Sequence, residues 1–453
     1  MPGSTTQANT SNHSAQKEMS QKQDSSKTDR KYIHIFGGGT RFDVAHHFKV
    51  EAEAKGTTAK ALYKLCKAKF PNMGLAPHLT YQVDGGYKTL ATNNDIQARV
   101  DMIKSRADSK IVFFSCALLD WIPDTLQLAG EKEMIKEFGK YTRRLETREN
   151  PHIHLSFAPA NKVIQSIRNG RKDIFLVGFK TTVGKSNQEM FEAGLRLCKE
   201  ASCNLVLVND AARHWNMIVT PEEAAYHETA NRDEVLANLV DMSFYRSQLT
   251  FTQSTVIASD LVPWDERIPA PLKAAVEHCI AGNAYKPFNG ATVGHFAFKM
   301  SDTEFVTSIR KSDFNKLPEI GMVYVRTDGP DTVLAYGAKP SVGGQSQRMV
   351  FRDHPGYDCI LHFHSPMRPD APDKIPVRSQ RNVECGSHQC GQNTSDGLET
   401  FEDDIKAVML EQHGPNIVFK RTTAPDKLIK FVERNWDLSK KTGGYTLEVG
   451  AGT

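Results

Sequence analysis

Four short, almost wholly apolar runs in the first half of the chain constrain its fold most. They are residues 32–36, 111–114, 174–177 and 205–208. Continuous apolar runs of this length are typical of strands that are buried on both faces of a parallel sheet. Stretches with helical periodicity lie between them, for example residues 57–68 and 187–201. Strands that alternate with helices predict a doubly wound α/β domain, in which ligands bind beyond the carboxyl ends of the strands.

The length of the chain predicts more than one domain. At 453 residues it exceeds the size at which a single hydrophobic core usually stops growing. Residues 1–30 are rich in Ser, Thr, Gln, Asn and Lys and predict a disordered polar tail. We expect a first domain at residues 31–245 and a second at 267–453. A run with Ser, Thr and Gln at 246–266, which contains Pro263 and is followed by Pro269 and Pro271, predicts the linker between them.

Composition narrows the classes of partner. With 39% hydrophobic and 24% charged residues the chain is typical of a globular protein, and a net charge of +4 is too small to predict binding to nucleic acid. No run approaches the roughly 18 apolar residues of a membrane span. Eight scattered cysteines and no recognisable signal peptide predict reduced thiols in a cytoplasmic protein. We therefore expect small-molecule ligands, and neither nucleic acid nor a membrane as a partner.

A glycine-rich turn follows the first apolar run. Gly38, Gly39 and Thr40 stand directly after residues 32–36. Such a turn lets backbone N–H groups approach a phosphate, but spacing alone leaves a tight turn without any ligand equally open.

The segments that follow the apolar runs resemble the phosphopantothenoylcysteine synthetase family over about residues 31–242. The resemblance rests on the glycine turn, SCALLDWIP at 115–123, GKYTRR at 139–144, VGFK at 177–180 and VND at 208–210. It implies a Rossmann-like fold in a homo-oligomer, which activates a carboxylate with CTP and Mg²⁺ as an acyl cytidylate and captures it with the amine of cysteine. The nucleotide-binding residues that it implies are Gly38, Gly39, Thr40, Asp120, Asn209 and Asp210, with Lys140 near the phosphates.

Two features of this family are not recognisable here. The family carries an Asp-x-Val-Arg step after its glycine turn, and then an Asn and a Ser-Ser-Gly run. The corresponding stretches read DVAHHFK at 43–49 and KGT at 55–57. Because a bidentate Arg is not interchangeable with His or Lys at a phosphate site, the sequence favours nucleotide binding in this half over the complete ligase reaction.

The second half contains a pattern of histidines that suits a metal. His362 and His364 lie two residues apart, and in an extended strand such side chains share one face. His413 follows in the segment EQHGP. Catalytic zinc sites usually take three protein ligands and keep the fourth position for water or substrate. The alternative is a pair of surface histidines, but the apolar run around them would make unpartnered imidazoles costly to bury. The sequence therefore predicts a zinc site.

Residues 267–446 resemble the class II aldolase/adducin family. The resemblance rests on NGATVGHF at 289–296, FVTS at 305–308, KPS at 339–341, the His-x-His step and QHGP at 412–415. It implies an α/β domain that holds Zn²⁺ through His362, His364 and His413. In the family, zinc polarises a carbonyl and stabilises an enediolate while a nearby Glu moves protons.

The proton-transfer residue of this family is missing. Its Glu falls on Gly343, which cannot carry a proton, and its phosphate-binding Asn falls on His295. The segment ECGSHQC at 384–390 lies between the second and third metal ligands, so we expect Glu384 to be the catalytic acid/base. A loop without any chemical role is the alternative.

Three functions remain open from these observations. The first is a zinc-dependent enzyme that acts on a small hydroxy-carbonyl compound or a sugar phosphate, with a first half that binds CTP or an acyl-phosphate ligand. The second is a bifunctional enzyme with full phosphopantothenate–cysteine ligase activity. The third is a non-catalytic, adducin-like assembly protein, which the missing Glu and Arg favour. We favour the first, because a scaffold has no use for three well-spaced histidines.

Overall fold

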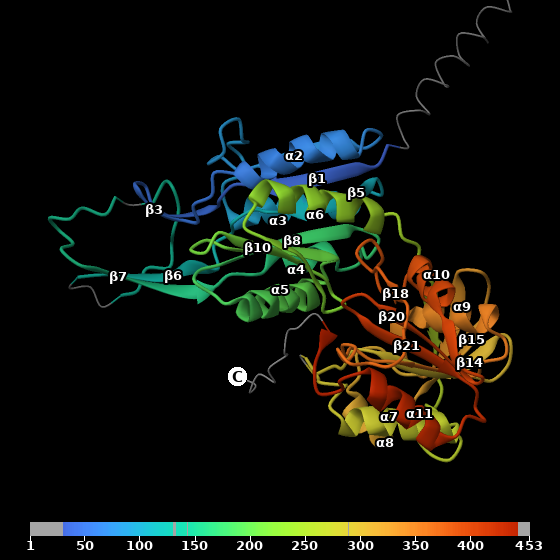
Figure 1. The fold of residues 1–453 in the computed structure, drawn as a ribbon. Helices are drawn as coiled ribbons and strands as arrows, with labels where there is room; N and C mark the ends of the chain where they lie inside the picture. The colour runs from blue at the N-terminus through green and yellow to red at the C-terminus, as the bar shows by residue number, and fades with distance from the viewer. Residues whose placement is uncertain (1–29, 130–132, 143, 289, 443–453) are drawn as a thin grey trace, which may run out of the picture. The chain divides into compact units, whose positions relative to one another are not determined.

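The computed structural model describes residues 30–129, 133–142, 144–288 and 290–442 (Figure 1). The expected polar tail lies outside the described residues except for Arg30. The chain divides into two compact units. The first contains the residues up to Gly178 together with Glu200–Cys203, and the second contains Phe179–Lys199 and everything from Asn204 onward. This division falls inside the segment that the sequence assigns to one domain.

A seven-stranded sheet confirms the predicted α/β fold. Its strand order is β11-β10-β9-β8-β5-β1-β4. The pairs β1–β4, β1–β5 and β5–β8 are parallel, whereas β10 is antiparallel to both β9 and β11. The bounds are β1 Tyr32–Gly37, β4 Gly74–Leu79, β5 Ser109–Phe114, β8 Phe175–Thr182, β9 Leu205–Asp210, β10 Trp215–Val219 and β11 Ala225–Thr229. The four apolar runs of the sequence form β1, β5, β8 and β9, as predicted.

The helices of this half are α2 Thr57–Lys69, α3 Asn93–Ser105, α4 Val163–Ile167, α5 Asn187–Ala201 and α6 Arg232–Arg246. Two of them, α2 and α5, confirm the helices predicted from periodicity. Helix α3 begins at a capping box, in which Thr92 and Asp95 each satisfy a backbone N–H of the other. Helix α2 packs on β1 and β4, and α6 packs on β9, β10 and β11. No helix in the described part of the chain is long and apolar enough to cross a membrane.

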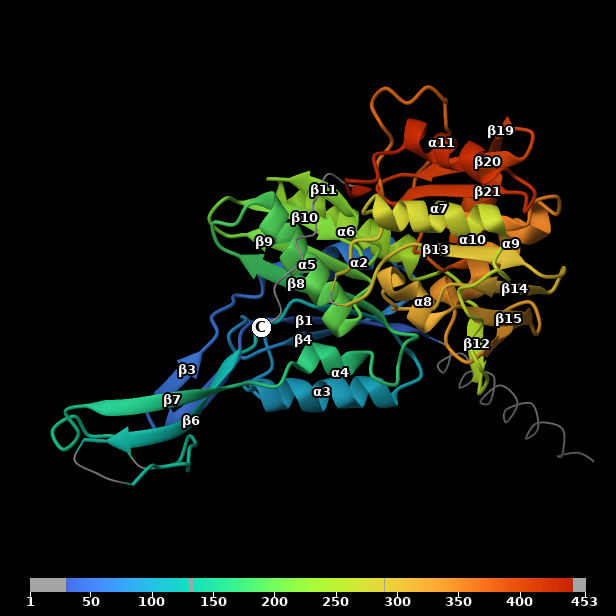
Figure 2. The same cartoon turned by 90° about the horizontal axis from the view of Figure 1, so that it is seen from below.

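Two antiparallel hairpins accompany the parallel strands of the first unit. One is formed by β2 Arg41–Ala45 with β3 Phe48–Glu51, and the other by β6 Trp121–Leu128 with β7 Ile153–Pro159. Both views show the β6–β7 hairpin projecting beyond the ends of the parallel strands (Figure 1, Figure 2). Lys140 lies in the connection between its two strands.

The second unit contains a ten-stranded mixed sheet. Its order is β12-β16-β15-β14-β13-β17-β21-β20-β18, with β19 paired to β20. The β12–β16 and β18–β20 pairs are parallel, and the other registered pairs are antiparallel. The bounds are β12 Gln253–Ile257, β13 His295–Lys299, β14 Glu304–Thr307, β15 Val323–Thr327, β16 Thr332–Tyr336, β17 Cys359–His362, β18 Val377–Arg378, β19 Glu399–Glu402, β20 Ile405–Leu410 and β21 Gly414–Phe419.

The expected linker contributes a strand to this sheet. Strand β12 lies within residues 246–266 and pairs along its whole length with β16. It stands at the end of the strand order, and most of its side chains are exposed or half-buried. An edge strand of this kind needs no apolar run. Because its sequence contains Ser and Thr instead, it is predicted to be part of a linker.

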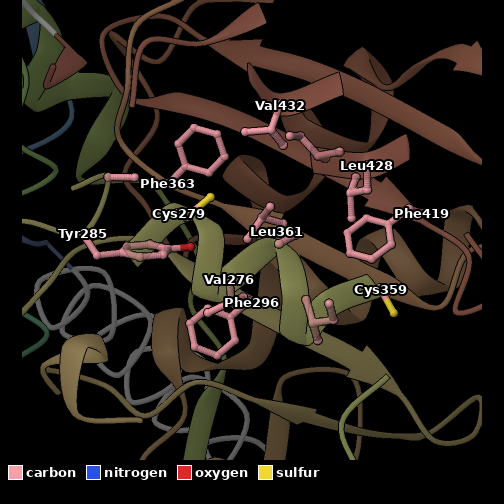
Figure 3. Packing of buried hydrophobic residues seen from close by; sticks show 14 of the residues in the cluster. Val276, Cys279, Tyr285, Phe296, Cys359, Leu361, Phe363, Phe419, Leu428 and Val432 are labelled. Atoms are coloured by element: carbon pink, nitrogen blue, oxygen red, sulfur yellow. The ribbon is translucent and has the colours of Figure 1, made fainter. Parts of the chain in front are cut away.

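Helices cover both faces of the second sheet and enclose two cores. Helices α7 Ala270–Ala281 and α11 Pro425–Asn435 pack together on one face, and α9 Gln345–Asp353 packs with α10 His388–Gly397 on the other (Figure 1). Figure 3 shows the first core, which contains Phe296, Leu361 and Phe419, whereas Ile360 belongs to the second. The remaining short helices are η1 Phe314–Lys316, α8 Leu317–Ile320 and η2 Ser341–Gly344.

Candidate metal centre

Strand β17 ends at His362, the first of the three predicted ligands, and His364 follows two residues after the end of the strand. Side chains alternate along an extended chain, and Leu361 and Phe363 lie in the core under α7 and α11. His362 and His364 therefore point to the opposite side of the sheet. The third histidine, His413, lies in the turn from β20 to β21, and β21 pairs directly with β17.

The three imidazoles are brought together. One nitrogen atom of each of His362, His364 and His413 lies within 4.8 Å of the others, and all three side chains are buried. Their ring centroids are 5.0 Å apart for His362 and His364, 4.8 Å for His362 and His413, and 4.6 Å for His364 and His413. Among the described residues, this is the one group of three or more His, Cys, Asp or Glu side chains so arranged.

Hydrogen bonding prepares these rings to bind a cation. The Nδ1 of His362 lies 2.6 Å from the carbonyl oxygen of Pro415, so Nδ1 donates and Nε2 keeps its lone pair. The Nδ1 of His364 and both ring nitrogens of His413 are buried without a hydrogen-bond partner. Buried polar atoms are rarely left unpaired because each costs free energy. A metal ion would accept the lone pair of one nitrogen from each ring, and three neutral imidazoles suit zinc.

The three histidines are held in the neutral form that binds metal. Burial lowers the pKa of His362 to about 4. Burial, and then the neighbouring charges of His413, His362 and Lys441, hold the pKa of His364 well below its usual value. The pKa of His413 is likewise well lowered, by burial first and then by His362 and Arg246. Neutral imidazole is the ligand form.

A fourth histidine, which the sequence did not assign to the metal, lies beside the triad. His295 is the register partner of His362 across β13 and β17, and the two ring centroids are 4.9 Å apart. Its Nδ1 is buried and has no hydrogen-bond partner. Burial, followed by His362 and His413, holds its pKa well below the usual value. His295 could have been assigned to the site only from the register of β13 against β17, which cannot be read from a single sequence.

Two residues bear on proton transfer: Gly343, where the family's Glu is expected, and Glu384, which the sequence proposes in its place. Gly343 belongs to η2, so no carboxylate stands there. Glu384 is half-buried, and its two carboxylate oxygens accept hydrogen bonds of 2.9 Å and 3.2 Å from the amide of Asn204. A role for Glu384 in catalysis stays a prediction.

The glycine turn of the first unit is tightly packed. A Cβ at Gly38, whose φ is 95°, would lie 2.1 Å from the hydroxyl of Thr80, and a Cβ at Gly39 would lie 1.7 Å from the carbonyl oxygen of Ala52. The N–H of Thr40 donates to the carbonyl of Ala117 at 3.0 Å. Close packing thus accounts for both glycines, and a phosphate contact at this turn stays a prediction.

The charged residues predicted for the nucleotide site of the first unit are exposed. Asp120 accepts a hydrogen bond of 2.5 Å from the ammonium group of Lys162. The ammonium of Lys140 lies 5.3 Å from the ring centroid of Tyr141. Both Asp120 and Lys140 are accessible to a ligand, but their contacts with Lys162 and Tyr141 give no evidence that a ligand binds there.

Asn209 and Asp210 end strand β9 in the second unit. The buried carboxylate of Asp210 accepts hydrogen bonds of 2.9–3.1 Å from the N–H groups of Gly184, Lys185, Ala212 and Arg213 and from the hydroxyl of Thr182. Burial raises its pKa, but these bonds hold the pKa well below the usual value. Asp210 therefore fixes two loops, whereas the half-buried side chain of Asn209 accepts a hydrogen bond of 3.3 Å from the hydroxyl of Thr181.

No protein-family model matches the sequence, and no curated protein matches it. Similar solved structures include the DNA/pantothenate metabolism flavoprotein from Streptococcus pneumoniae, which is 14% identical over 47% of this chain and 97% of its own, with a TM-score of 0.38. The C-terminal domain of the coenzyme A biosynthesis bifunctional protein CoaBC is 14% identical over 47% and 94%, with a TM-score of 0.34. The L-fuculose-1-phosphate aldolase from Thermus thermophilus is 18% identical over 39% and 92%, with a TM-score of 0.29. Both kinds of protein that the sequence resembles thus occur among them.

We expect the wild-type protein, purified without chelators, to contain one zinc ion per chain, and His362→Ala to lose it, because two remaining imidazoles form an incomplete site. Elemental analysis of both proteins measures this. His278→Ala, which removes a half-buried histidine outside the triad, is the matched control and should keep the metal. A wild-type protein without metal, or equal metal in His362→Ala, would contradict the assignment.

We also expect the metal-free protein to lose stability as the pH falls from about 7 to 5. The buried histidines have lowered pKa values, so they take up protons on unfolding, and the stability that they contribute is fully present above the unfolded pKa of about 6.5 and decreases as the pH falls below it. Each such histidine contributes up to about 1.4 kcal/mol per pH unit. Urea unfolding of chelator-treated protein at both pH values measures the loss, and a flat profile would contradict neutral buried imidazoles.

Proposed function

We propose that the chain is a zinc-dependent enzyme of the class II aldolase type, which acts on a small hydroxy-carbonyl compound or a sugar phosphate. The observation that carries this proposal is the buried triad, in which the tautomer of His362 is fixed and the Nδ1 of His364 and both ring nitrogens of His413 have no hydrogen-bond partner. In an assembly protein without a metal, these unpaired buried atoms would lower the stability of the fold and serve no function. His362, His364 and His413 would hold the ion, and bound zinc supplies a Lewis acid that polarises a carbonyl.

The residues of the chain itself prepare the site for such a substrate. The carbonyl of Pro415 orients the ring of His362, and burial of all three imidazoles keeps bulk water away. The buried and unpaired nitrogen of His295 offers a further polar contact beside the triad. A small polar ligand would meet several convergent groups in otherwise apolar surroundings, which is the usual character of a substrate site.

We further propose that the first half binds CTP with Mg²⁺, or an acyl-phosphate ligand, and that the protein works as a homo-oligomer. The support for nucleotide binding is the placement of the glycine turn after β1, a parallel strand, where such folds bind ligands. Lys140, which is exposed, is the residue expected near the phosphates.

The proposed enzyme should show zinc-dependent proton exchange or cleavage with some member of a panel of sugar phosphates and small hydroxy-carbonyl compounds. General acid–base assistance contributes about 10²–10⁴-fold, so an altered site should still retain a measurable background that requires zinc. Deuterium incorporation followed by NMR, with zinc-loaded and chelator-treated protein, measures it. Activity that appears only in Gly343→Glu would show that the natural site has lost its catalyst, as an assembly protein would.

Calorimetry should detect binding of CTP to the full chain, and Lys140→Ala should weaken it because a phosphate contact is lost. ATP is the matched ligand for base specificity. Lys172→Ala, which removes an exposed lysine elsewhere in the first unit, is the control. If neither nucleotide releases heat up to millimolar concentration, the first half does not bind a nucleotide in this way.

A further inference from the structure

A buried cluster of charges in the second unit takes no part in the site described so far. Glu223 and Lys441 are 4% and 5% exposed, and the ammonium of Lys441 lies 3.6 Å from a carboxylate oxygen of Glu223. The ammonium of Lys199 lies 4.0 Å from the other oxygen. Both separations exceed a hydrogen bond, and both oxygens of Glu223 and the Nζ of Lys441 have no hydrogen-bond partner. Glu223 thus forms ion pairs with two lysines but no hydrogen bond with either.

The preceding residue shows that full pairing is available in the same loop. Glu222 accepts hydrogen bonds from Arg246, at 3.3 Å to each oxygen, and from the N–H of Cys385 at 2.9 Å. The other donors of Arg246 reach the carbonyls of Gln380 and Arg381. Two adjacent buried glutamates thus have opposite environments. Glu222 has the contacts of a structural group, whereas Glu223 keeps the lone pairs that a proton acceptor needs.

Short contacts connect this cluster to the histidine triad. Thr442, the residue after Lys441, donates its N–H to the carbonyl of His364 at 3.2 Å and its hydroxyl to the carbonyl of His413 at 3.0 Å. The N–H of Ala225 donates to the side chain of Gln412, which precedes His413, at 3.2 Å. Hydrogen bonds therefore join the loop that carries Glu223 to Gln412, and the segment that carries Lys441 to His364 and His413.

The backbone is strained at these same points. Glu223 has a φ of 67° and Gln412 a φ of 53°, in the left-handed region that residues with a side chain seldom adopt. Such conformations persist only where their surroundings enforce them, and they cluster at active sites. Here one lies at the unpaired carboxylate and the other next to a metal ligand.

We propose that Glu223 is the proton-transfer residue of the metal site, in place of the carboxylate that is absent at Gly343. The inference rests on the proposed zinc-dependent function. A Glu223 oxygen takes a proton from the carbon next to the substrate carbonyl. The electron pair of that C–H bond forms a C=C bond, and the carbonyl oxygen gains the negative charge. In the reverse step the same carboxylic acid returns the proton to that carbon, where the C=C electron pair forms a C–H bond again and the C=O bond is restored.

The two lysines have a distinct role in this arrangement. The ammonium groups lie 3.6 Å and 4.0 Å from the carboxylate oxygens of Glu223 and make no hydrogen bond to them, so both oxygens keep the lone pairs that can accept a proton. Lys199 is itself anchored by a hydrogen bond of 2.7 Å to the carbonyl of Pro221. The lysines are therefore positioning residues, and only the carboxylate meets the substrate.

Zinc affinity tests the placement of the cluster without any substrate. A negative charge near the ion strengthens its binding and a positive charge weakens it, so Glu223→Gln should bind zinc at least about fivefold more weakly and Lys441→Met at least about fivefold more tightly. Competition with a chromophoric chelator measures both. Lys440→Met makes the same change at the adjacent, exposed lysine and should leave the affinity unchanged. A merely structural ion pair would weaken zinc binding in both variants.

Proton exchange tests the role of the carboxylate. In zinc-loaded Glu223→Gln, deuterium incorporation into dihydroxyacetone phosphate should fall by about 10²–10⁴-fold from the wild-type rate. Equal zinc affinity in wild type, Glu223→Gln and Lys441→Met, or zinc binding that weakens in Glu384→Gln but not in Glu223→Gln, would overturn the assignment to Glu223. A wild-type protein that binds no zinc would instead overturn the proposed function, on which this inference depends.

Discussion

The alternation of side chains along β17 is the constraint on which the second unit depends. Leu361 and Phe363 point into the core under α7 and α11, where the ring of Phe363 meets that of Trp436 edge to face, with centroids 6.0 Å apart (Figure 3). His362 and His364 point the other way. Since the side-chain period of a strand is two, a shift of one residue would bury both imidazoles in the apolar core. Packing of the core therefore fixes the register of the site.

The backbone around the triad is held as firmly as the side chains. The carbonyl of His362 accepts a hydrogen bond of 3.1 Å from the hydroxyl of Tyr285, and the carbonyls of His364 and His413 are bound by Thr442. Gly414 follows His413 with a φ of 136°, and a Cβ there would lie 2.0 Å from the carbonyl oxygen of Phe363. The close approach of these two segments, which brings His413 to the other rings, thus requires glycine at this position.

Features that depend on local pattern could be predicted from the sequence, and features that depend on strand pairing could not. The apolar runs predicted β1, β5, β8 and β9, and the His-x-His step predicted a pair of imidazoles on one face. His295 lies beside the triad only because β13 pairs with β17 in one register. Glu384 was chosen for its nearness in sequence to the ligands, whereas Glu223 is distant in sequence and joins the site through Lys441 and Thr442.

The distribution of unpaired polar atoms separates structure from function in the second unit. Arg246 and Glu222 are also buried, yet their charges are matched and the donors of Arg246 reach carbonyls or the carboxylate of Glu222. Such a network needs no ligand. The unpaired nitrogens of His364 and His413 and the unpaired oxygens of Glu223 lie in segments that hydrogen bonds tie together. Because leaving these atoms unsatisfied costs stability, and the same loop shows that pairing is attainable, their shared location supports the proposal that a metal ion and a substrate complete these groups.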